Sequence, residues 1–184
     1  MTHGVTVVLA LLGVAGQVLV AAGLVAAAAA ALGAPGPLRA VRSALWGYEL
    51  WAVFGVAALG TGGSLFFSEV AGYVPCELCW YERICLYPLT PVALLAALAV
   101  DFRVARYLLP LPLVGAGIAV YHLLVEEGVV SQTQACLASA PGGCATKWID
   151  EFGFVTIPTL ALTSFLLAAG LLALAAAGDD AGPA

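Results

Sequence analysis

Four of the five cysteines in this 184-residue chain form two pairs whose spacing could carry redox chemistry. Cys76 and Cys79 form a Cys-x-x-Cys motif within the stretch "CELCWYER", and Cys136 and Cys144 form a wider pair. A Cys-x-x-Cys motif encloses too few residues to hold distant parts of a chain together, and redox enzymes repeatedly use this spacing. The first pair is therefore a candidate for thiol–disulfide exchange.

The wider pair has two interpretations. Paired cysteines in an oxidising compartment most often form structural disulfides. The intervening "LASAPGG" is flexible and turn-forming, so a bond between Cys136 and Cys144 would close a small loop and stiffen little else. A bond that stabilises little is easier to explain as one that reacts, but the residues alone leave both interpretations open.

Cys79 is predicted to be the reactive thiolate of the first pair. Pro75 is typical of a helix start, so Cys79 is expected in a first helical turn, where unpaired N–H groups favour an anion. Arg83 follows four residues later, about 40° away around a helix, so the two side chains share a face. A cation near a thiol lowers its pKa. Snorkelling of Arg83 to the membrane surface is the alternative, but it does not explain this register.

Two other uses of the cysteines are less favoured. Two cysteine pairs could build a tetrahedral zinc site, but structural zinc sites use compact knuckles, and seven residues separate Cys136 from Cys144. We therefore predict no metal site. Cys85 lies about 240° around the helix from Cys79 and is expected to face elsewhere, as an inert membrane cysteine.

The elements that carry these residues are predicted to be transmembrane helices. The chain is 63% hydrophobic and 9% charged, which suits lipid better than water. With about twenty apolar residues per crossing, we predict five crossings, at roughly 5–32, 44–67, 84–100, 106–126 and 154–177. Short connections make sequential helices antiparallel neighbours. The predicted fold is therefore all-α, a polytopic membrane helical bundle.

The basic residues orient this bundle in the membrane. Arginines lie in the connections after the first and third crossings: Arg39, Arg42, Arg103 and Arg106. Because short basic loops stay in the cytoplasm, the N-terminus and the two cysteine loops, 68–82 and 127–153, are expected outside and the C-terminus inside. The first crossing is read as a membrane helix rather than a cleaved signal peptide, because "MTHG" lacks a basic start. The net charge of −5 offers no basic surface for nucleic acid.

The loop after the second cysteine pair has a helical pattern. Apolar residues recur at Ala145, Trp148, Ile149 and Phe152, opposite charged residues. The pattern predicts a short helix in the membrane interface that holds the loop over the first cysteine pair. Ordinary anchoring of the loop is the alternative.

Taken together, the motifs resemble the DsbB-type disulfide-generating membrane proteins, and more closely their BdbC-type branch with shorter loops. The runs that carry the resemblance are "PCELCWYERICLY", the second cysteine pair and "CATKWIDEFGFVTIPTLAL". The resemblance implies a four-helix redox core over 44–177, preceded by an extra transmembrane helix and cytoplasmic connection in 1–43 and followed by a cytoplasmic tail, 178–184.

The resemblance also implies a function. Such a protein, in the bacterial cytoplasmic membrane, is a thiol:quinone oxidoreductase that reoxidises a thioredoxin-like, DsbA/BdbD-type oxidase outside the membrane and passes the electrons to a quinone, ubiquinone or menaquinone. Cys136 and Cys144 would exchange with the partner, with the mixed disulfide at Cys136. Cys76 and Cys79 would receive the electrons, and Cys79 would face the quinone.

Two further site residues follow from the resemblance. Arg83 would polarise a quinone carbonyl, and His122 falls where the family often has a histidine close to the quinone. His122 could equally be a hydrogen-bonded interfacial residue, paired with Glu126 one turn away. A membrane location suits the chemistry, because thiol exchange conserves the number of disulfides and new ones require an electron acceptor.

Two other functions stay open on the sequence. A vitamin K epoxide reductase-like enzyme also couples thiols to quinones in a helical bundle, although its Cys-x-x-Cys motif usually lies next to the last helices. A non-catalytic membrane scaffold or transporter subunit could use the cysteines only to brace its loops.

Overall fold

Five helical segments of the computed structural model, which describes residues 2–179, are long and apolar enough to cross a membrane. They are Thr2–Ala31, Glu49–Val70, Glu77–Ala99, Val104–Glu126 and Ile157–Gly178. A helix satisfies its backbone hydrogen bonds internally, as lipid requires. The all-α membrane bundle predicted from the sequence is confirmed, although the third span begins earlier than predicted, because "ELCWYER" continues this helix rather than preceding it.

Prolines divide two of these spans into shorter helices. Pro88 separates α4 from α5, and Pro110 opens α7 directly after α6, since proline lacks the N–H that continues a helix. The helices are α1 (Thr2–Ala31), α2 (Gly36–Leu45), α3 (Glu49–Leu65, extended by a π-helical turn at Phe66–Val70), α4 (Glu77–Leu86), α5 (Leu89–Ala99), α6 (Val104–Leu108), α7 (Pro110–Glu126), α8 (Gln134–Ser139) and α9 (Ile157–Asp179).

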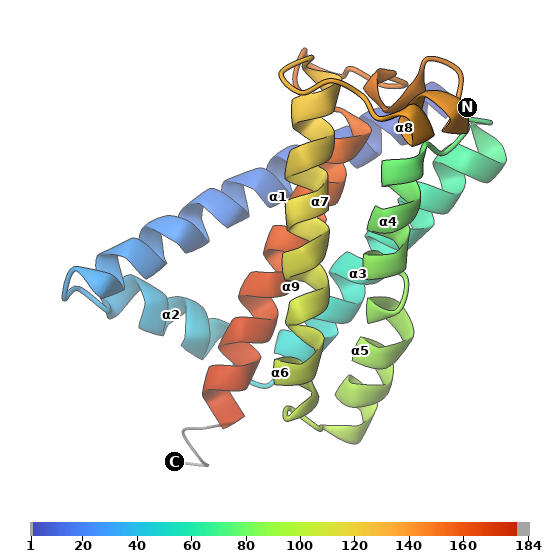
Figure 1. Ribbon diagram of the computed structural model, residues 1–184. Helices are drawn as coiled ribbons and strands as arrows, with labels where there is room; N and C mark the ends of the chain where they lie inside the picture. Colours follow the sequence, from blue (N-terminus) through green and yellow to red (C-terminus); the bar gives the residue numbers. More distant parts are fainter. Residues whose placement is uncertain (1, 180–184) are drawn as a thin grey trace.

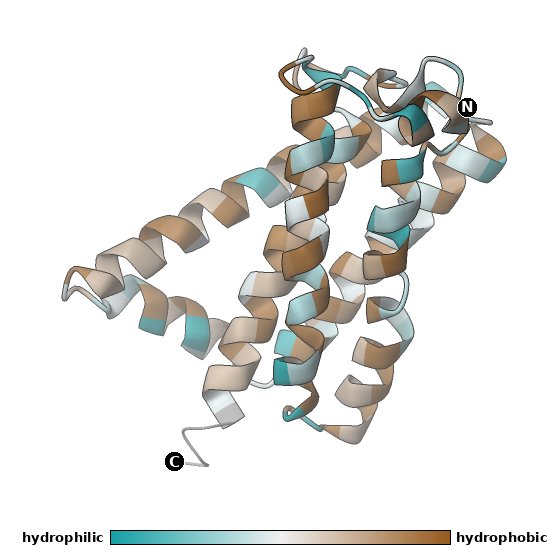
Figure 2. Cartoon of the chain, viewed as in Figure 1, coloured by the Kyte–Doolittle hydropathy of each residue, from teal (hydrophilic) through white to brown (hydrophobic). Residues whose placement is uncertain are grey.

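Helix α9 packs against α1, α3 and α7, while α3 packs on α5 and α4 packs on α7 (Figure 1). The core between them contains fully buried apolar side chains, among them Leu50, Val53, Leu89, Phe165 and Leu172. Figure 2 shows hydrophobic residues along the middle of the bundle, apart from a hydrophilic stretch in α4, and hydrophilic residues mainly near its two ends. This distribution is that of a protein surrounded by lipid.

The two ends of the bundle differ in the chemistry they carry. The N-terminus, α8 and the start of α4 lie at one end, and α6 and the C-terminal end of α9 lie at the other (Figure 1). Helix α2 belongs to the second end, because the Arg42 guanidinium donates a 2.8 Å hydrogen bond to the carbonyl of Ala177. The cysteine pairs therefore lie at the end opposite the arginines of α2 and the α5–α6 connection.

Two parts of the chain differ from the sequence predictions. The connection after the first crossing is a helix, α2, with Arg42 over the ring of Trp46. The interfacial helix predicted around Ala145–Phe152 is wrong. Only a 3₁₀ turn, Gly143–Ala145, forms there, because Phe152 and Gly153 take up positive φ in a turn that pairs Glu151 with Val155. Of the predicted C-terminal tail, residues 180–184 lie outside the described residues.

The loop is held down by an aromatic stack instead of a helix. Trp148 stacks on Tyr73 at 5.1 Å between ring centroids, and Tyr73 stacks in turn on Phe67 of the π-helical turn. Lys147 adds a 2.6 Å ion pair with Glu127. The alternative of ordinary loop anchoring therefore describes this segment.

Candidate functional site

The first cysteine pair starts helix α4. Cys76 is the N-cap residue, in an extended conformation after Pro75, and its sulfur accepts the backbone N–H of Cys79 at 3.2 Å. Cys79 therefore lies in the first helical turn, as the sequence predicts. Both thiols are free and their sulfur atoms lie 2.6 Å apart. Cys76 is buried and Cys79 is partly exposed, so the pair turns its two sulfurs toward different surroundings.

The second pair forms a disulfide. Cys136 lies in the first turn of α8, where Thr133 caps the helix by accepting the Cys136 N–H at 3.1 Å. Cys144 follows Gly142 and Gly143, which both have positive φ and return the chain sharply to α8. The two half-cystines are only 1% and 2% exposed. Both sulfurs are therefore closed off from solvent in this conformation.

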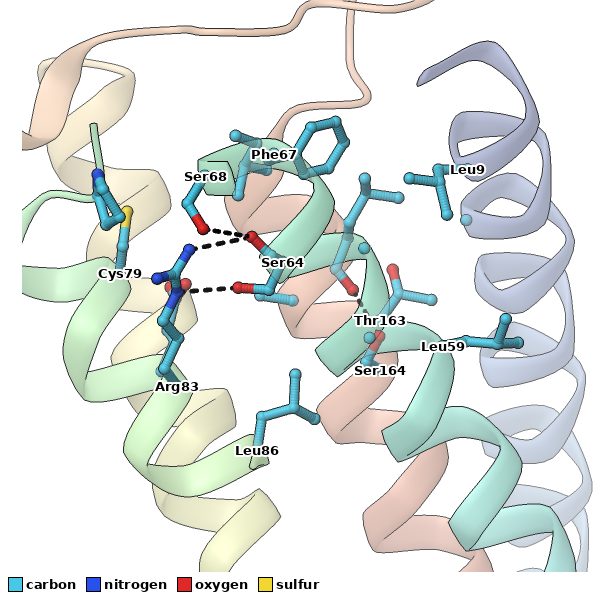
Figure 3. Close-up of a pocket in the computed structure, with 18 of the residues that line it drawn as sticks. Leu9, Leu59, Ser64, Phe67, Ser68, Cys79, Arg83, Leu86, Thr163 and Ser164 are labelled. Carbon is cyan, nitrogen blue, oxygen red and sulfur yellow. Dashed lines mark hydrogen bonds between the residues drawn. The ribbon is translucent and has the colours of Figure 1, made fainter. Parts of the chain in front are cut away.

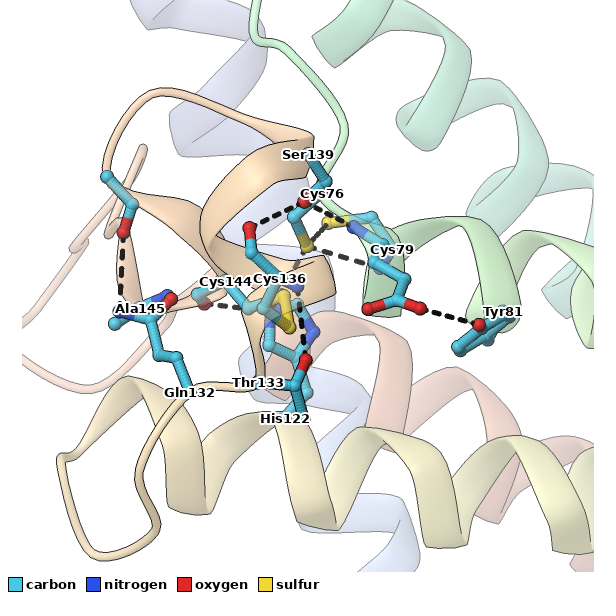
Figure 4. Close-up of a disulfide and its surroundings, with 12 residues drawn as sticks. Cys76, Cys79, Tyr81, His122, Gln132, Thr133, Cys136, Ser139, Cys144 and Ala145 are labelled. Atoms are coloured by element: carbon cyan, nitrogen blue, oxygen red, sulfur yellow. Dashed lines mark hydrogen bonds between the residues drawn. A yellow bond between two sulfur atoms is a disulfide. The ribbon is translucent and has the colours of Figure 1, made fainter.

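The two pairs belong to one buried cluster, together with Leu78 and Val125. Ser139 of α8 ties the pairs together, because its hydroxyl accepts the N–H of Glu77 at 3.0 Å and donates to the carbonyl of Cys136 at 2.8 Å (Figure 4). The disulfide is thus fastened to the N-terminus of α4.

His122 of α7 lies between the two pairs. Its Nε2 is 3.6 Å from the sulfur of Cys76 and 3.2 Å from the carbonyl oxygen of Cys144. Its Nδ1 is 2.9 Å from a carboxylate oxygen of Glu82. The predicted pairing with Glu126 is wrong, because Glu126 accepts a hydrogen bond from Thr156 instead. The imidazole contacts the sulfur of Cys76 and is not among the residues that line the cavity described below.

Glu82 is a site residue that the sequence analysis missed. Its side chain is buried within the third span, hydrogen-bonded to His122 and also exposed to the cavity. An ionisable residue inside a transmembrane segment is rare and marks function by default. The sequence "CELCWYER" contains this acid, but the sequence analysis assigned a role only to the neighbouring Arg83.

The Cys76 thiol, which precedes the third span, has a lowered pKa. Hydrogen bonding from the Cys79 thiol, and then from His122, lowers the pKa of Cys76 from 9.0 to about 5, against the opposing effect of burial. The structure favours Cys76 over the predicted Cys79 as the thiolate, because His122 contacts the sulfur of Cys76.

A cavity of about 170 Å³ lies on the other side of α4, between α1, α3, α4 and α9 (Figure 3). Cys79, Glu82 and Arg83 supply polar atoms, and the remaining lining is mostly apolar. Cys79 and Arg83 thus share one face of α4 in the structure. Trp148, from the loop that carries Cys136 and Cys144, also lines the cavity.

Arg83 is held at the cavity by α3. Its Nε donates to the Ser64 hydroxyl at 2.9 Å, one terminal nitrogen donates to the Ser64 carbonyl at 3.0 Å, and the rings of Trp80 and Tyr87 flank it. Within residues 2–179, no carboxylate pairs with this guanidinium and its other terminal nitrogen has no acceptor. A buried cation with spare donors favours a ligand that presents oxygen.

The cysteines also bear on metal binding. Cys76, Cys79 and His122 place three ligand atoms within 4.8 Å of one another, a set that zinc could use. The four-cysteine site weighed from the sequence cannot form while Cys136 and Cys144 are bonded to each other. Cys85 packs in the apolar core with Leu89 and takes no part in this site.

This geometry defines a class, a membrane-embedded protein with two cysteine pairs in one buried cluster at one end of a helical bundle. The chain belongs to the DsbB family, since the family model described as "Disulfide bond formation protein DsbB" matches residues 46–176. It is therefore a disulfide-forming membrane oxidoreductase. The match favours this function over the scaffold and the vitamin K epoxide reductase-like alternatives.

Individual relatives agree with the family. "Disulfide bond formation protein C" of Bacillus subtilis is 42% identical over 121 residues, which cover 65% of this chain and 84% of that protein. A "Probable disulfide formation protein" of Deinococcus radiodurans is 38% identical over 132 residues, covering 67% and 86%. One of Metapseudomonas resinovorans is 42% identical over 118 residues, covering 64% and 81%. No solved structure matches the chain significantly.

The lowered pKa of Cys76 predicts how its reactivity depends on pH. Because the thiolate persists above pH about 5, alkylation of Cys76 in the reduced protein should remain fast from neutral pH down to that value. His122→Ala removes one of the stabilising contacts and should move the midpoint upward. Peptide mass spectrometry after iodoacetamide pulses measures the rate at each cysteine, and unreacted Cys85 shows that the fold is intact. A midpoint near 9.0 would contradict the assignment.

Proposed function

We propose that this protein is a thiol:quinone oxidoreductase that reoxidises a thioredoxin-like oxidase, of the DsbA/BdbD type, outside the cytoplasmic membrane. Electrons pass from the partner to Cys136 and Cys144, then to Cys76 and Cys79, and then to ubiquinone or menaquinone. One observation supports this most directly. The Cys76–Cys79 motif faces the second cysteine pair on one side and, on the other, an apolar cavity that contains a buried arginine.

A quinone suits the cavity in chemistry and in size. Arg83 has free N–H donors for a ring carbonyl oxygen, and the apolar lining suits the ring. A cavity of about 150 Å³ can bind benzene, so about 170 Å³ accommodates one quinone ring. When bound, the quinone supplies the sink for two electrons and two protons that thiol exchange alone lacks.

The proposed electron transfer consists of two successive dithiol–disulfide exchanges and one oxidation by the quinone, and its atoms and electrons balance. The partner's thiolate attacks Cys136, the Cys136–Cys144 bond breaks, and a second partner thiol displaces Cys136 to leave the partner oxidised. The Cys136–Cys144 dithiol then reduces a Cys76–Cys79 disulfide in the same way. Finally Cys76 and Cys79 lose two electrons and two protons and regain their disulfide.

His122 and Glu82 provide a route for the protons. His122 contacts the sulfur of Cys76 and is hydrogen-bonded to the Glu82 carboxylate, and Glu82 is one of the residues that line the cavity. Protons released from the thiols can therefore cross α4 to the place where quinol formation consumes them. His122 thus serves the thiols directly and the quinone through Glu82, a different position from the one expected from the resemblance.

The proposed topology places both cysteine loops and the N-terminus outside and the C-terminus in the cytoplasm. The arginines of α2 and of the α5–α6 connection, at the opposite end from the cysteines, support this orientation. The buried Cys136–Cys144 disulfide then lies near the outer membrane surface, packed with Cys76, Leu78 and Val125. The partner must approach the membrane closely, since only a short loop joins Cys136 and Cys144.

The decisive experiment is an anaerobic titration of the purified, full-length protein with a reduced thioredoxin-like dithiol partner, with and without quinone. The expected result is one quinone reduced per partner disulfide formed, followed by absorbance. Cys79→Ser should abolish quinone reduction, because the inner disulfide cannot form, and Cys85→Ser is the matched control that should retain it. The proposal fails if Cys79→Ser still reduces quinone, or if a zinc chelator alone abolishes the activity.

Arg83→Ala tests the contact with the quinone carbonyl. Loss of a charged hydrogen bond, about 1.5–3 kcal/mol, should raise the apparent KM for quinone by about tenfold or more. The rate of exchange between the partner and Cys136 should not change, because Arg83 lies on the other side of α4. Arg103→Ala, at the opposite end of the bundle, serves as the control. An unchanged quinone KM in folded Arg83→Ala would reject the role.

Glu82→Gln tests the proton route, because it preserves a hydrogen-bonding partner for His122 but cannot carry a proton. The expected result is a kcat for quinone reduction lower by about a hundredfold, the usual scale of general acid–base catalysis, with little change in quinone KM. The pH dependence of kcat should flatten, which a merely structural role would not cause. A variant with the wild-type kcat would show that the protons take another path.

A further inference from the structure

Helix α1 lies outside the residues that match the family, 46–176, yet it lines the cavity that contains Cys79 and Arg83. Its contribution comes from one helical face: Leu9, Leu12, Gly13 and Gly16. The family core by itself would leave this side of the cavity to lipid. A part of the chain with no assigned role therefore belongs to the proposed quinone site.

The two glycines fix α1 close to α9. Both are buried, and a Cβ on Gly13 would overlap the side chain of Leu160. A Cβ on Gly16 would lie 2.8 Å from a methyl group of Thr163 and 3.2 Å from Leu167. Small residues let transmembrane helices approach this closely. The α9 residues they touch also line the cavity, so α1 is packed as part of its wall.

The cavity is lined along a long stretch of α3. The α3 residues that line it recur on one face from Val56 to Ser68, a rise of about 18 Å along the helix. Ser64, which holds Arg83, is near one end of this face, and Leu59 is toward the other. The lined face of α3 is longer than one quinone ring, so it continues past the ring position at Arg83 toward Leu59.

The end of the cavity away from Arg83 meets the lipid. Leu12 of α1 and Leu59 of α3 both line the cavity, and yet they are 49% and 58% exposed. Figure 3 shows Leu9 and Leu59 between α1 and α3, on the far side from Arg83 and Cys79. A ligand bound at Arg83 therefore has an apolar path out to the bilayer between these two helices.

We propose that α1 and α3 bind the first part of the quinone's isoprenoid tail, so that α1 makes the site selective for prenylated quinones over the bare ring. This inference rests on the proposed function and adds the tail contact to it. The tail is the occupant because the groove continues from the polar ring site, is lined by leucine and glycine, and opens to lipid. No contact to the ring is assigned to α1.

The test compares a ubiquinone ring lacking a tail with the same ring carrying a short isoprenoid tail, as acceptors for the full-length protein and a reduced dithiol partner. Wild type should show a lower KM for the prenylated quinone. Leu12→Trp fills the groove and should raise that KM by about tenfold while leaving the KM for the bare ring within about twofold. Leu19→Trp, on an exposed part of α1 that does not line the cavity, should change neither.

Leu12→Ala is a second variant for the case in which Leu12→Trp does not fold, because it removes the tail contact without adding volume. It should also weaken only the prenylated quinone. The inference is overturned if wild type uses both quinones with equal KM, or if the Leu12 variants affect both quinones equally. Absence of reduction of either quinone by wild type would instead refute the proposed function, so the two failures are distinguishable.

Discussion

The site depends on how the N-cap of α4 is made. The sulfur of Cys76 accepts the N–H of Cys79, which fixes one cysteine before the helix and the other within its first turn. The two sulfurs stay adjacent but face different environments, Cys76 toward α7 and α8 and Cys79 toward the cavity. A Cys-x-x-Cys motif at a helix start can thereby connect a reactant in water with one dissolved in lipid.

The charged groups around this motif are arranged so that the membrane tolerates them. Glu82 is paired with His122, and Arg83 is held by Ser64 between two aromatic rings. Neither side chain is left to lipid, where an uncompensated charge is costly. Of these two successive residues of α4, Glu82 contacts His122 and also lines the cavity, whereas Arg83 contacts α3 and lines the cavity.

Burial of the Cys136–Cys144 disulfide limits how a partner could exchange with it. Cys136 and Cys144 are almost fully covered, and their loop is attached by the stack of Trp148 on Tyr73. An aromatic stack and an exposed ion pair are worth about 1 kcal/mol each. Ser139 adds hydrogen bonds that tie the disulfide to the start of α4. Under the proposed function, a partner that exchanges with this disulfide must displace both sets of contacts.

The sequence alone determined the fold class, the five crossings and the redox pairs, because hydrophobic length and cysteine spacing are local properties. It also placed Cys79 and Arg83 on one face, since helical periodicity fixes that relation. It did not determine which sulfur is the thiolate, the pairing of His122 with Glu82, or the loop conformation after Cys144. Those depend on contacts between residues far apart in the chain. Only packing of α7 against α4 brings the histidine to Cys76, and only packing of α1 against α9 makes the N-terminal helix part of the cavity.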